Sequence, residues 1–391
     1  KTPRRQRQMC IRDRYLGSRS LPGEPSNKYS KAAKQIIDTG LNCLGTTTTP
    51  EFGLTGTTES LRFGATCNPW NTAYSTGGSS GGSSALVAAG VIPIAHANDG
   101  AGSIRIPASC CGLVGLKASR GRIKDKEVPS YLPANILHDG VVTRSVRDTW
   151  AFHAEIEKNI PATEFPPIGD ISESFPKNLK IAVLTENCLG EDSSAELVQA
   201  THDVARLCES LGHEVEMISN PFYKKFDEDF WLLWAHFGFL IRYSVGKELS
   251  SKFDHTQLEQ WPKYLISRHW RNIHKVPVAF WRLRGFVSQY ETFMQKFDIL
   301  LTPTLGTTVP KLGFFGPEVS GQEHWERIND FLPFTKYQNI SGAPAITLPC
   351  GTDLKGLPIG IQLSSRLGED RLLLKLSLQL EQNSNWKSLN K

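Results

Sequence analysis

The 391-residue chain can form one large α/β domain or about two or three domains of average size, and its mean hydropathy of -0.28 is typical of a globular protein. Residues 1–14 carry the whole formal net charge of +5, so the rest of the chain is neutral and lacks the charge pattern of a nucleic-acid-binding or membrane-binding protein. The eight cysteines contain no C-x-x-C pair, which predicts buried free thiols in a reducing compartment rather than a disulfide framework or a zinc site.

Residues 1–14 show neither an apolar period nor a helix cap, and we interpret them as an artefactual or disordered tail. On this interpretation the true N-terminus, with any targeting signal, is missing from the sequence. Residues 15–391 are then expected to form one domain that lacks its N-terminal part and lies in the cytoplasm. A Pro-rich stretch at 159–170 is either a linker or a long surface loop.

Short β-branched runs alternate with helical patterns along the chain, which is typical of an α/β fold with a largely buried sheet. Helices are expected over 30–40, over 193–212, where Ser193 and Glu196 have the spacing of a capping box, and over 369–382. The expected strands are short apolar runs, and they cover residues 91–97, 112–118, 179–185, 298–304, 344–350 and 358–363.

Residues 222–297 hold 19 of the 37 aromatic residues, mostly at helical spacing. The segment either packs in the core or contributes rings to a pocket for an apolar substrate. Its apolar run at 230–241 is interrupted by His236 and is too short to cross a bilayer.

A loop rich in serine and glycine, "STGGSSGG", follows Tyr74 and leads into a small apolar helix. It lacks the lysine of a phosphate-binding loop, and a dinucleotide fingerprint in "GAGSIR" fails because Arg105 stands where the third glycine belongs. The loop fits G-x-S-x-G twice, around Ser79 and around Ser80. A nucleophile elbow needs an apolar strand before this motif, however, and here the preceding residues are polar. No histidine stands in a setting that marks it as a base.

A second loop, "DGAGS", allows successive amides of residues 100–103 to point toward a developing oxyanion, with Ser103 as the nucleophile. Serine is a weak nucleophile at its ordinary pKa and needs a base or a relay to one. A second hydroxyl held in a rigid glycine loop can serve as that relay. The alternative for each loop alone is a tight turn with helix-capping serines.

The two loops together resemble the signature of the amidase signature family over residues 68–123. The resemblance extends over roughly residues 15–387 and includes the stretches "TPEFGLTGTTES", "GVVTRSVRDT", "FDILLTPT", "NISGAPAITLPCG" and "LPIGIQL". It implies an α/β fold in which a large mixed sheet is covered by helices on both faces.

The resemblance implies that Ser103 is the nucleophile and that Ser79, on a cis peptide bond, carries its proton. Residues Gly100, Ala101 and Gly102 match the oxyanion loop, and Ala101 departs from the usual glycine without removing its N–H.

Three further positions match supporting residues of the family, namely Gly78, Asp99 and Arg105. A charge-assisted pair between Asp99 and Arg105 is expected to brace the loop. Neither a metal ion nor an organic cofactor is expected.

The third member of the family's triad is a lysine in a Lys-Asp dipeptide, well upstream of the segment that matches residues 17–21. The only similar dipeptide is Arg12-Asp13, and arginine does not lose its proton in proteins. Lys28, Lys31 and Lys34 lie on the wrong element, and Lys117 matches a structural lysine. We therefore name no base and expect the 391 residues to have little activity.

The expected function is hydrolysis of a carboxylic acid amide to an acid and an amine. One alternative is the glutaminase subunit of a tRNA-dependent amidotransferase, although Ile106 stands where that subunit typically has glutamine. Another is a non-catalytic binding protein of the same fold. The expected substrate is a small amide with an apolar or aryl group, with no nucleic-acid or membrane partner, and a homodimer is left open.

Overall fold

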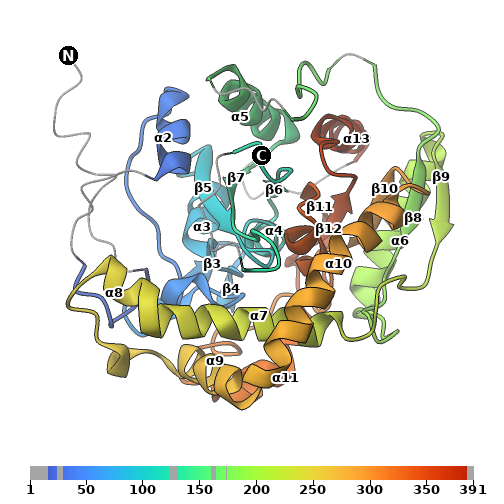
Figure 1. Ribbon diagram of the computed structural model, residues 1–391. Helices are drawn as coiled ribbons and strands as arrows, with labels where there is room; N and C mark the ends of the chain where they lie inside the picture. Colours follow the sequence, from blue (N-terminus) through green and yellow to red (C-terminus); the bar gives the residue numbers. More distant parts are fainter. Residues whose placement is uncertain (1–15, 24–29, 124–130, 160–163, 173, 385–391) are drawn as a thin grey trace.

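The computed structural model describes residues 16–23, 30–123, 131–159, 164–172 and 174–384. Its centre is one eight-stranded sheet (Figure 1). The strands, in their order across the sheet, are β5 (Ile94–Asp99), β7 (His138–Thr143), β6 (Val114–Lys117), β11 (Ala345–Thr352), β12 (Pro358–Ser364), β10 (Ile299–Pro303), β8 (Lys180–Val183) and β9 (Glu214–Met217). Neighbours from β5 to β10 are antiparallel, whereas β8 is parallel to both β10 and β9, so the sheet is mixed.

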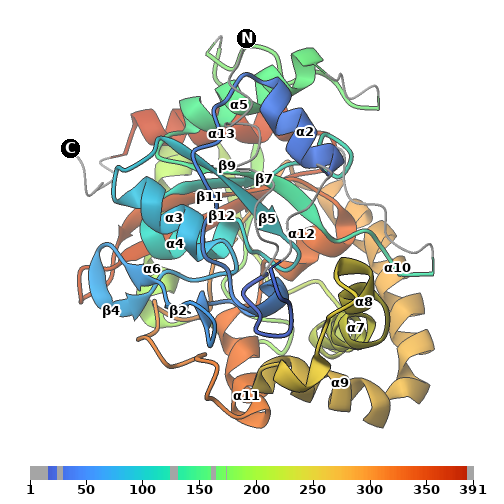
Figure 2. The ribbon, with the colours of Figure 1, turned by 90° about the vertical axis from the view of Figure 1, so that its left-hand side faces the viewer.

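Helices cover both faces of this sheet. Helices α5 (Val146–Asn159) and α13 (Asp370–Gln382) lie on one face, and α3 (Gly81–Ala88), α4 (Arg105–Cys111) and α12 (Lys336–Ser341) lie on the other (Figure 2). Buried apolar side chains form a large cluster on the α4 side and a smaller one between the sheet and α13. The expected arrangement of a mixed sheet between helices is confirmed.

An outer layer of helices lies beyond α12 and comes mainly from the aromatic-rich segment. It contains α7 (Phe226–Leu240), the π-helical turn η2 (Ile241–Val245), α8 (Gly246–Leu249), α9 (Gln260–Arg271), α10 (Val276–Met294) and α11 (Gly321–Phe331). Most rings on α7 are buried, so core packing accounts for the larger part of the aromatic segment.

The remaining elements are short or peripheral. They are α2 (Lys31–Asp38), the 3-10 turns η1 (Glu51–Gly53), η3 (His255–Gln257) and η4 (Ile273–Lys275), and two small hairpins, β1 (Glu59–Ser60) with β2 (Gly64–Ala65) and β3 (Cys67–Asn68) with β4 (Asn71–Ser75). Helix α6 (Ala195–Ser210), in contrast, packs on β9, β10 and β12 of the large sheet.

All six expected strands lie in the large sheet, but β7 and β9 were not expected. Strand β7 begins with the polar residues His138 and Asp139, so its apolar residues are too few to form a recognisable strand pattern in the sequence. Strand β9 lies at the edge of the sheet with its two glutamates exposed, so it lacks the buried run from which strands are recognised.

The capping box expected at Ser193 is wrong. Helix α6 begins at Ala195 after the N-cap residue Ser194. The hydroxyl of Ser193 instead donates to the backbone carbonyl of Thr185 at 3.1 Å, so it is occupied by the chain that leaves β8. The spacing of Ser193 and Glu196 alone cannot show that the carbonyl group of Thr185 binds the serine hydroxyl in place of the helix N-terminus.

The expectation that the thiols are buried is wrong for two cysteines. Cys43 and Cys67 are exposed, whereas Cys110, Cys111, Cys188 and Cys208 are buried and Cys350 is half-buried. All seven are free, and Cys10 lies outside the described residues.

Strands on both sides of residues 159–170 belong to the same sheet, so this stretch does not separate two sheets. Among the described residues, no helix has both the length and the apolar character needed to cross a membrane.

Candidate active site

Ser103 lies in the turn that joins β5 to α4. At Gly102 the backbone φ is 120°, and an added Cβ would lie 2.6 Å from Oγ1 of Thr335, so only glycine fits there. Ser103 is buried, with 5% of its surface exposed. The turn therefore holds this hydroxyl in a largely enclosed place.

Ser79 lies between β4 and α3, and the Gly78–Ser79 peptide bond is cis, as the resemblance implied. Gly78 is packed closely, since an added Cβ would lie 2.4 Å from the carbonyl oxygen of Thr57. On another side, a Cβ added at Gly53 would lie 3.3 Å from Oγ of Ser79. The serine is thus surrounded by backbone that only glycines allow to come so close.

The first serine loop lies against the end of β5, the strand that leads into the second serine loop. Ser80, which follows Ser79, donates its hydroxyl to the carbonyl oxygen of Asn98 at 3.3 Å and accepts the N–H of Asn98 at 3.1 Å. The hydroxyls of Ser79 and Ser103 have no hydrogen-bond partner among the described residues, and no bond joins them. The direct contact expected between them stays a prediction.

Backbone N–H groups line the turn beside Ser103. Those of Gly100, Ala101 and Ser103 have no acceptor among the described residues. The N–H of Gly102 differs from the expectation, because it donates to Oδ1 of Asp99 at 2.7 Å. The amides open to a ligand in this conformation are therefore those at 100, 101 and 103.

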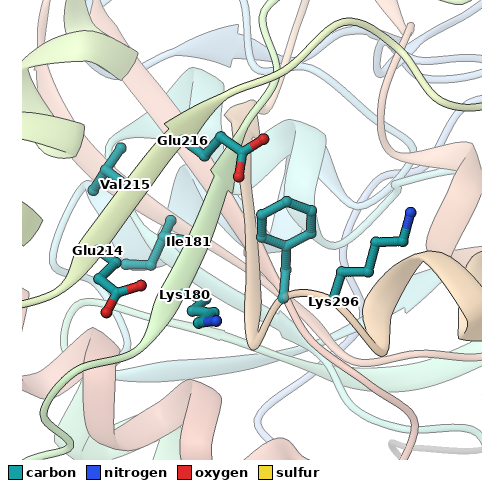
Figure 3. A pocket seen from close by; sticks show the side chains of 7 residues that line it. Lys180, Ile181, Glu214, Val215, Glu216 and Lys296 are labelled. Atoms are coloured by element: carbon teal, nitrogen blue, oxygen red, sulfur yellow. The ribbon is translucent and has the colours of Figure 1, made fainter.

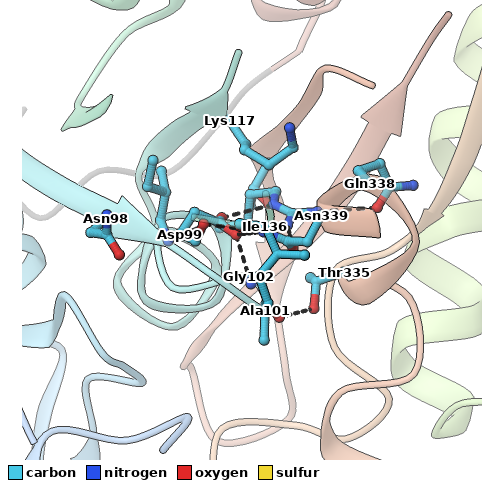
Figure 4. Close-up of polar contacts among 12 residues, drawn as sticks. Asn98, Asp99, Ala101, Gly102, Lys117, Ile136, Thr335, Gln338 and Asn339 are labelled. Carbon is cyan, nitrogen blue, oxygen red and sulfur yellow. Dashed lines mark hydrogen bonds and ion pairs between the residues drawn. The ribbon is translucent and has the colours of Figure 1, made fainter. Parts of the chain in front are cut away.

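A buried ion pair holds this turn. Nε and Nη2 of Arg105 donate to the two carboxylate oxygens of Asp99 at 3.0 and 2.9 Å, and neither side chain is exposed. The same guanidinium donates to the side-chain oxygens of Gln338, Gln362 and Asn339 at 3.1, 2.7 and 2.7 Å. Figure 4 shows Asp99 and Asn339 close together beside Gly102 of the turn. The expected pair is present, and its charges are paired and hydrogen-bonded, as buried charges must be.

The carboxylate of Asp99 also fixes the backbone of the turn. It accepts the N–H groups of Gly102 at 2.7 Å and Ile104 at 3.2 Å. Burial alone would raise the pKa of this carboxyl, but the charge and hydrogen bonds of Arg105, with a hydrogen bond from Asn339, lower it below its usual value. Asp99 is therefore ionised and carries out no proton transfer at neutral pH.

No base is identified among the described residues. Residues 12–13 and Lys28 lie outside them, Lys31 and Lys34 lie on α2, and Lys117 is buried in β6. Nζ of Lys117 donates to the backbone carbonyl of the next residue at 3.0 Å. No lysine of the described ranges donates to the hydroxyl of Ser79.

The nucleophile-elbow alternative does not fit the structure. Strand β4, which precedes Ser79, pairs with β3 in a hairpin outside the large sheet, whereas an elbow follows a strand of the central sheet. His138 is paired in register with Asp99, yet burial, together with the charges of Lys117, Arg120 and Arg105, lowers its pKa well below the usual value. This histidine is therefore neutral.

Four bracing residues were not singled out from the sequence. Thr335 donates to the carbonyl oxygen of Ala101 at 2.6 Å, and the others bind Arg105. Asn339 and Gln362 lie within two of the stretches that resemble the amidase signature family. The sequence therefore marked these stretches, but it did not show that the two side chains bind Arg105. Thr335 and Gln338 precede those stretches and gave no signal.

A surface hollow of about 410 Å³ lies far from these serines. Lys180, Glu214, Glu216 and Lys296 line it together with apolar side chains (Figure 3). It belongs to β8 and β9, at the opposite end of the sheet from β5. Its charges have both signs and it contains no hydroxyl nucleophile, so it is not the candidate site.

Two buried carboxyl groups lie beside the turn that carries Gly53. Oε2 of Glu51 accepts the N–H of Glu259 at 2.7 Å, and Oε1 of Glu259 accepts the N–H of Leu61 at 2.7 Å. Burial raises the pKa of Glu51 to about 6. Burial and the charge of Glu51 raise the pKa of Glu259 to about 7.

Comparisons with known proteins show the family to which the chain belongs. The sequence model of the Amidase family matches residues 13–374, and the chain therefore belongs to the amidase family. AmiC of Mycobacterium tuberculosis, which is assigned as an amidase, is 42% identical over 358 residues that cover 91% of this chain and 75% of AmiC.

Two solved structures show the same fold. A 6-aminohexanoate cyclic dimer hydrolase superposes with a TM-score of 0.85 at 31% identity, covering 97% of this chain and 82% of that one. A bacterial aryl acylamidase of the amidase signature family superposes with a TM-score of 0.82 at 25% identity, covering 96% and 80%.

We predict that Arg105→Met lowers the free energy of unfolding by about 3–5 kcal/mol, because Asp99 is then buried without its counter-charge. Urea unfolding followed by circular dichroism measures the change. The control is Arg147→Met, since Arg147 and Asp148 form an exposed pair at 3.4 Å. This substitution should lower the free energy of unfolding by less than about 1 kcal/mol. Equal losses in the two variants would contradict the bracing role of the buried pair.

We predict that Glu259→Gln becomes more stable relative to the wild type as the pH rises from about 5 to about 8. The raised pKa of Glu259 means that the folded wild type holds a proton that the unfolded chain has released, so its stability falls with rising pH in this window. The expected gain is on the order of 2 kcal/mol. The buried histidines contribute equally to the pH dependence of stability in both proteins, so their contributions cancel in the difference between variant and wild type.

Urea unfolding of both proteins at several pH values measures this difference. Glu216→Gln, at an exposed position of β9, is the control and should follow the wild type at every pH. A Glu259→Gln curve parallel to the wild-type curve would rule out the proposed burial effect.

Proposed function

We propose that this chain carries the two catalytic serines of an amide hydrolase, which forms an acyl-enzyme on Ser103, uses Ser79 as the proton relay and needs an amine base that none of the described residues is identified to supply. The observation that carries the proposal is the contact of Ser80, in the first serine loop, with Asn98 of β5, the strand that leads into the turn of Ser103. It supports the proposal that the hydroxyls of Ser79 and Ser103, which have no partner among the described residues, meet beside the N–H groups of residues 100, 101 and 103, which have no acceptor there. Nucleophile, relay and oxyanion donors are the parts that acyl transfer needs.

In the proposed reaction, Oγ of Ser103 attacks the carbonyl carbon of the amide while its proton passes to Ser79, and the proton of Ser79 passes to a neutral amine base. The N–H groups of residues 100, 101 and 103 bind the tetrahedral oxyanion. The C–N bond then breaks, the nitrogen takes the relayed proton, and the amine leaves. Water next attacks the ester on Ser103 and releases the acid, which restores the hydroxyl of Ser103.

The role of Gly102 in this proposal is structural. Its N–H is held by Asp99 at 2.7 Å, and its positive φ of 120° lets the turn reverse beneath Thr335. This bond keeps the neighbouring amides of Ala101 and Ser103 in fixed directions, so little reorganisation is needed when charge develops.

The proposed substrates are amides with an apolar or aryl acyl group. The ring of Trp234 lies beside Gly100, which supplies an apolar surface at the oxyanion turn. The names of the similar structures point the same way, since one acts on a cyclic dimer of 6-aminohexanoate and another is an aryl acylamidase.

We predict that a fluorophosphonate probe labels the wild type at Ser103 over hours and that Ser103→Ala loses the label completely, because the reacting oxygen is gone. Mass spectrometry of the labelled peptide measures this. Ser79→Ala should slow labelling by on the order of 100-fold through loss of the relay.

The matched control for this experiment is Ser80→Ala. Ser80 is adjacent to Ser79 and fits the same G-x-S-x-G pattern, but its hydroxyl binds the backbone of Asn98. We expect it to keep most of the labelling. A label on Ser80, or one that survives Ser103→Ala, would refute the assignment of the nucleophile.

Low turnover by the 391 residues also stays a prediction, since no lysine among the described residues reaches Ser79. Ammonia release from benzamide measures it, with Ser103→Ala as the background. Wild-type release well above that background would show that a base acts in this chain.

A further inference from the structure

Trp234 of α7 lies against the turn that carries Ser103. A Cβ added at Gly100 would lie 3.2 Å from Cη2 and 3.4 Å from Cζ3 of Trp234, and 3.0 Å from Cδ2 of Leu137. The edge of the six-membered indole ring thus occupies the space in which any other residue would place its side chain. Because the N–H of Gly100 has no acceptor among the described residues, this edge borders the proposed oxyanion site.

The same indole also reaches the surroundings of Ser79. Its Nε1 donates to the carbonyl oxygen of Leu54 at 3.0 Å. Leu54 follows Gly53, whose added Cβ would lie 3.3 Å from Oγ of Ser79. A single side chain therefore spans the distance between the backbone beside one serine and the backbone beside the other.

The ring is fixed in its plane as well as at its ends. Phe230, one helical turn earlier on α7, is stacked on Trp234 with centroids 5.9 Å apart and 19° between the ring planes. Trp234 is 6% exposed, so it has no open space into which it can turn. A ligand at the turn meets a rigid flat wall, since closely packed rings do not move aside at low cost.

We propose that Trp234 determines the acyl specificity of the site. It admits amides whose carbon next to the scissile carbonyl is unbranched or belongs to a flat aryl ring, and it excludes amides with a quaternary carbon there. This inference rests on the proposed function, because it takes the amides beside Ser103 as the place where the carbonyl oxygen binds. On this binding mode the carbon next to the carbonyl lies near Gly100. Atoms of Leu137 and of the indole edge lie only 3.0–3.4 Å from the position of an added Cβ there, so a branched carbon has less room than a flat group.

The test measures binding rather than turnover, so that it does not depend on the base. Isothermal titration calorimetry compares pentanamide with its isomer trimethylacetamide, which has the same atoms but a quaternary carbon. We expect the wild type to bind pentanamide at least about tenfold more tightly. Trp234→Phe removes the outer ring edge and keeps an aromatic ring, and it should reduce this ratio to below about threefold. Trp234→Leu is a second variant with the same expectation, and thermal melting confirms that each protein is folded.

Trp261→Phe is the matched control. Nε1 of Trp261 donates to the same carbonyl oxygen of Leu54 at 2.9 Å, but its ring is stacked on His324 with centroids 4.0 Å apart. The atoms nearest to the Cβ position of Gly100 belong to Leu137 and Trp234, not to Trp261. This variant loses an equivalent hydrogen bond and should keep the wild-type ratio.

Three outcomes overturn the inference: equal affinities in the wild type, a ratio that survives both Trp234 substitutions, or no binding of either amide. An equal loss of the ratio in Trp261→Phe also overturns it, because the effect then comes from the position of Leu54. The two proposals can also fail separately. If Trp234 controls the ratio of affinities but fluorophosphonate does not label Ser103, the specificity role of Trp234 is supported and the proposed hydrolysis through Ser103 is refuted.

Discussion

The ion pair between Asp99 and Arg105 is the contact on which the geometry of the site depends. Two charges removed from water cost several kcal/mol each unless their partners are well placed, so conformations that separate them are strongly disfavoured. The carboxylate binds two N–H groups of the turn, and the guanidinium binds side chains of α12 and β12. One electrostatic constraint thereby connects the end of β5, the start of α4 and two elements more than 200 residues later. It fixes the turn amides before any ligand arrives, which is the condition for efficient binding of an oxyanion.

Helix α12 transmits this constraint to the outer layer. Its first turn follows Thr335, which holds the carbonyl of Ala101, and its Asn339 donates to both the carboxylate and the backbone carbonyl of Asp99. The other side of α12 packs on α10, and Tyr337 contacts the rings of Phe226 and Phe286. The aromatic helices are therefore attached to the turn that carries Ser103 through a short helix that is buried along its whole length. Their packing and the shape of the site are parts of one structure.

The fold could be predicted to the extent that burial leaves a pattern in the sequence. Six strands were visible as short apolar runs, whereas edge strand β9 and the polar start of β7 left no such run. In the site, glycine and serine spacing indicated both loops, and the resemblance to the amidase signature family implied the pair of Asp99 with Arg105. The use of the Gly102 amide by Asp99 was not predictable, because amides at 100, 101 and 102 are equivalent in sequence and differ only in backbone direction. Contacts of Gln338 and Trp234 depend on packing between distant segments, which no local motif encodes.

In the proposed reaction, chemistry and selectivity depend on different interactions. The turn amides and the two serines are held by buried charges and by glycines that exclude other residues, so changes there cost both stability and reactivity. The wall beside Gly100 comes from α7, and its tryptophan is fixed by one hydrogen bond and by ring stacking. Such contacts are individually worth about 1 kcal/mol and tolerate replacement by another apolar side chain far better than an ion pair does. A site built this way can change the acyl group it accepts through α7 while the braced turn, and with it the route of the proton, stays the same.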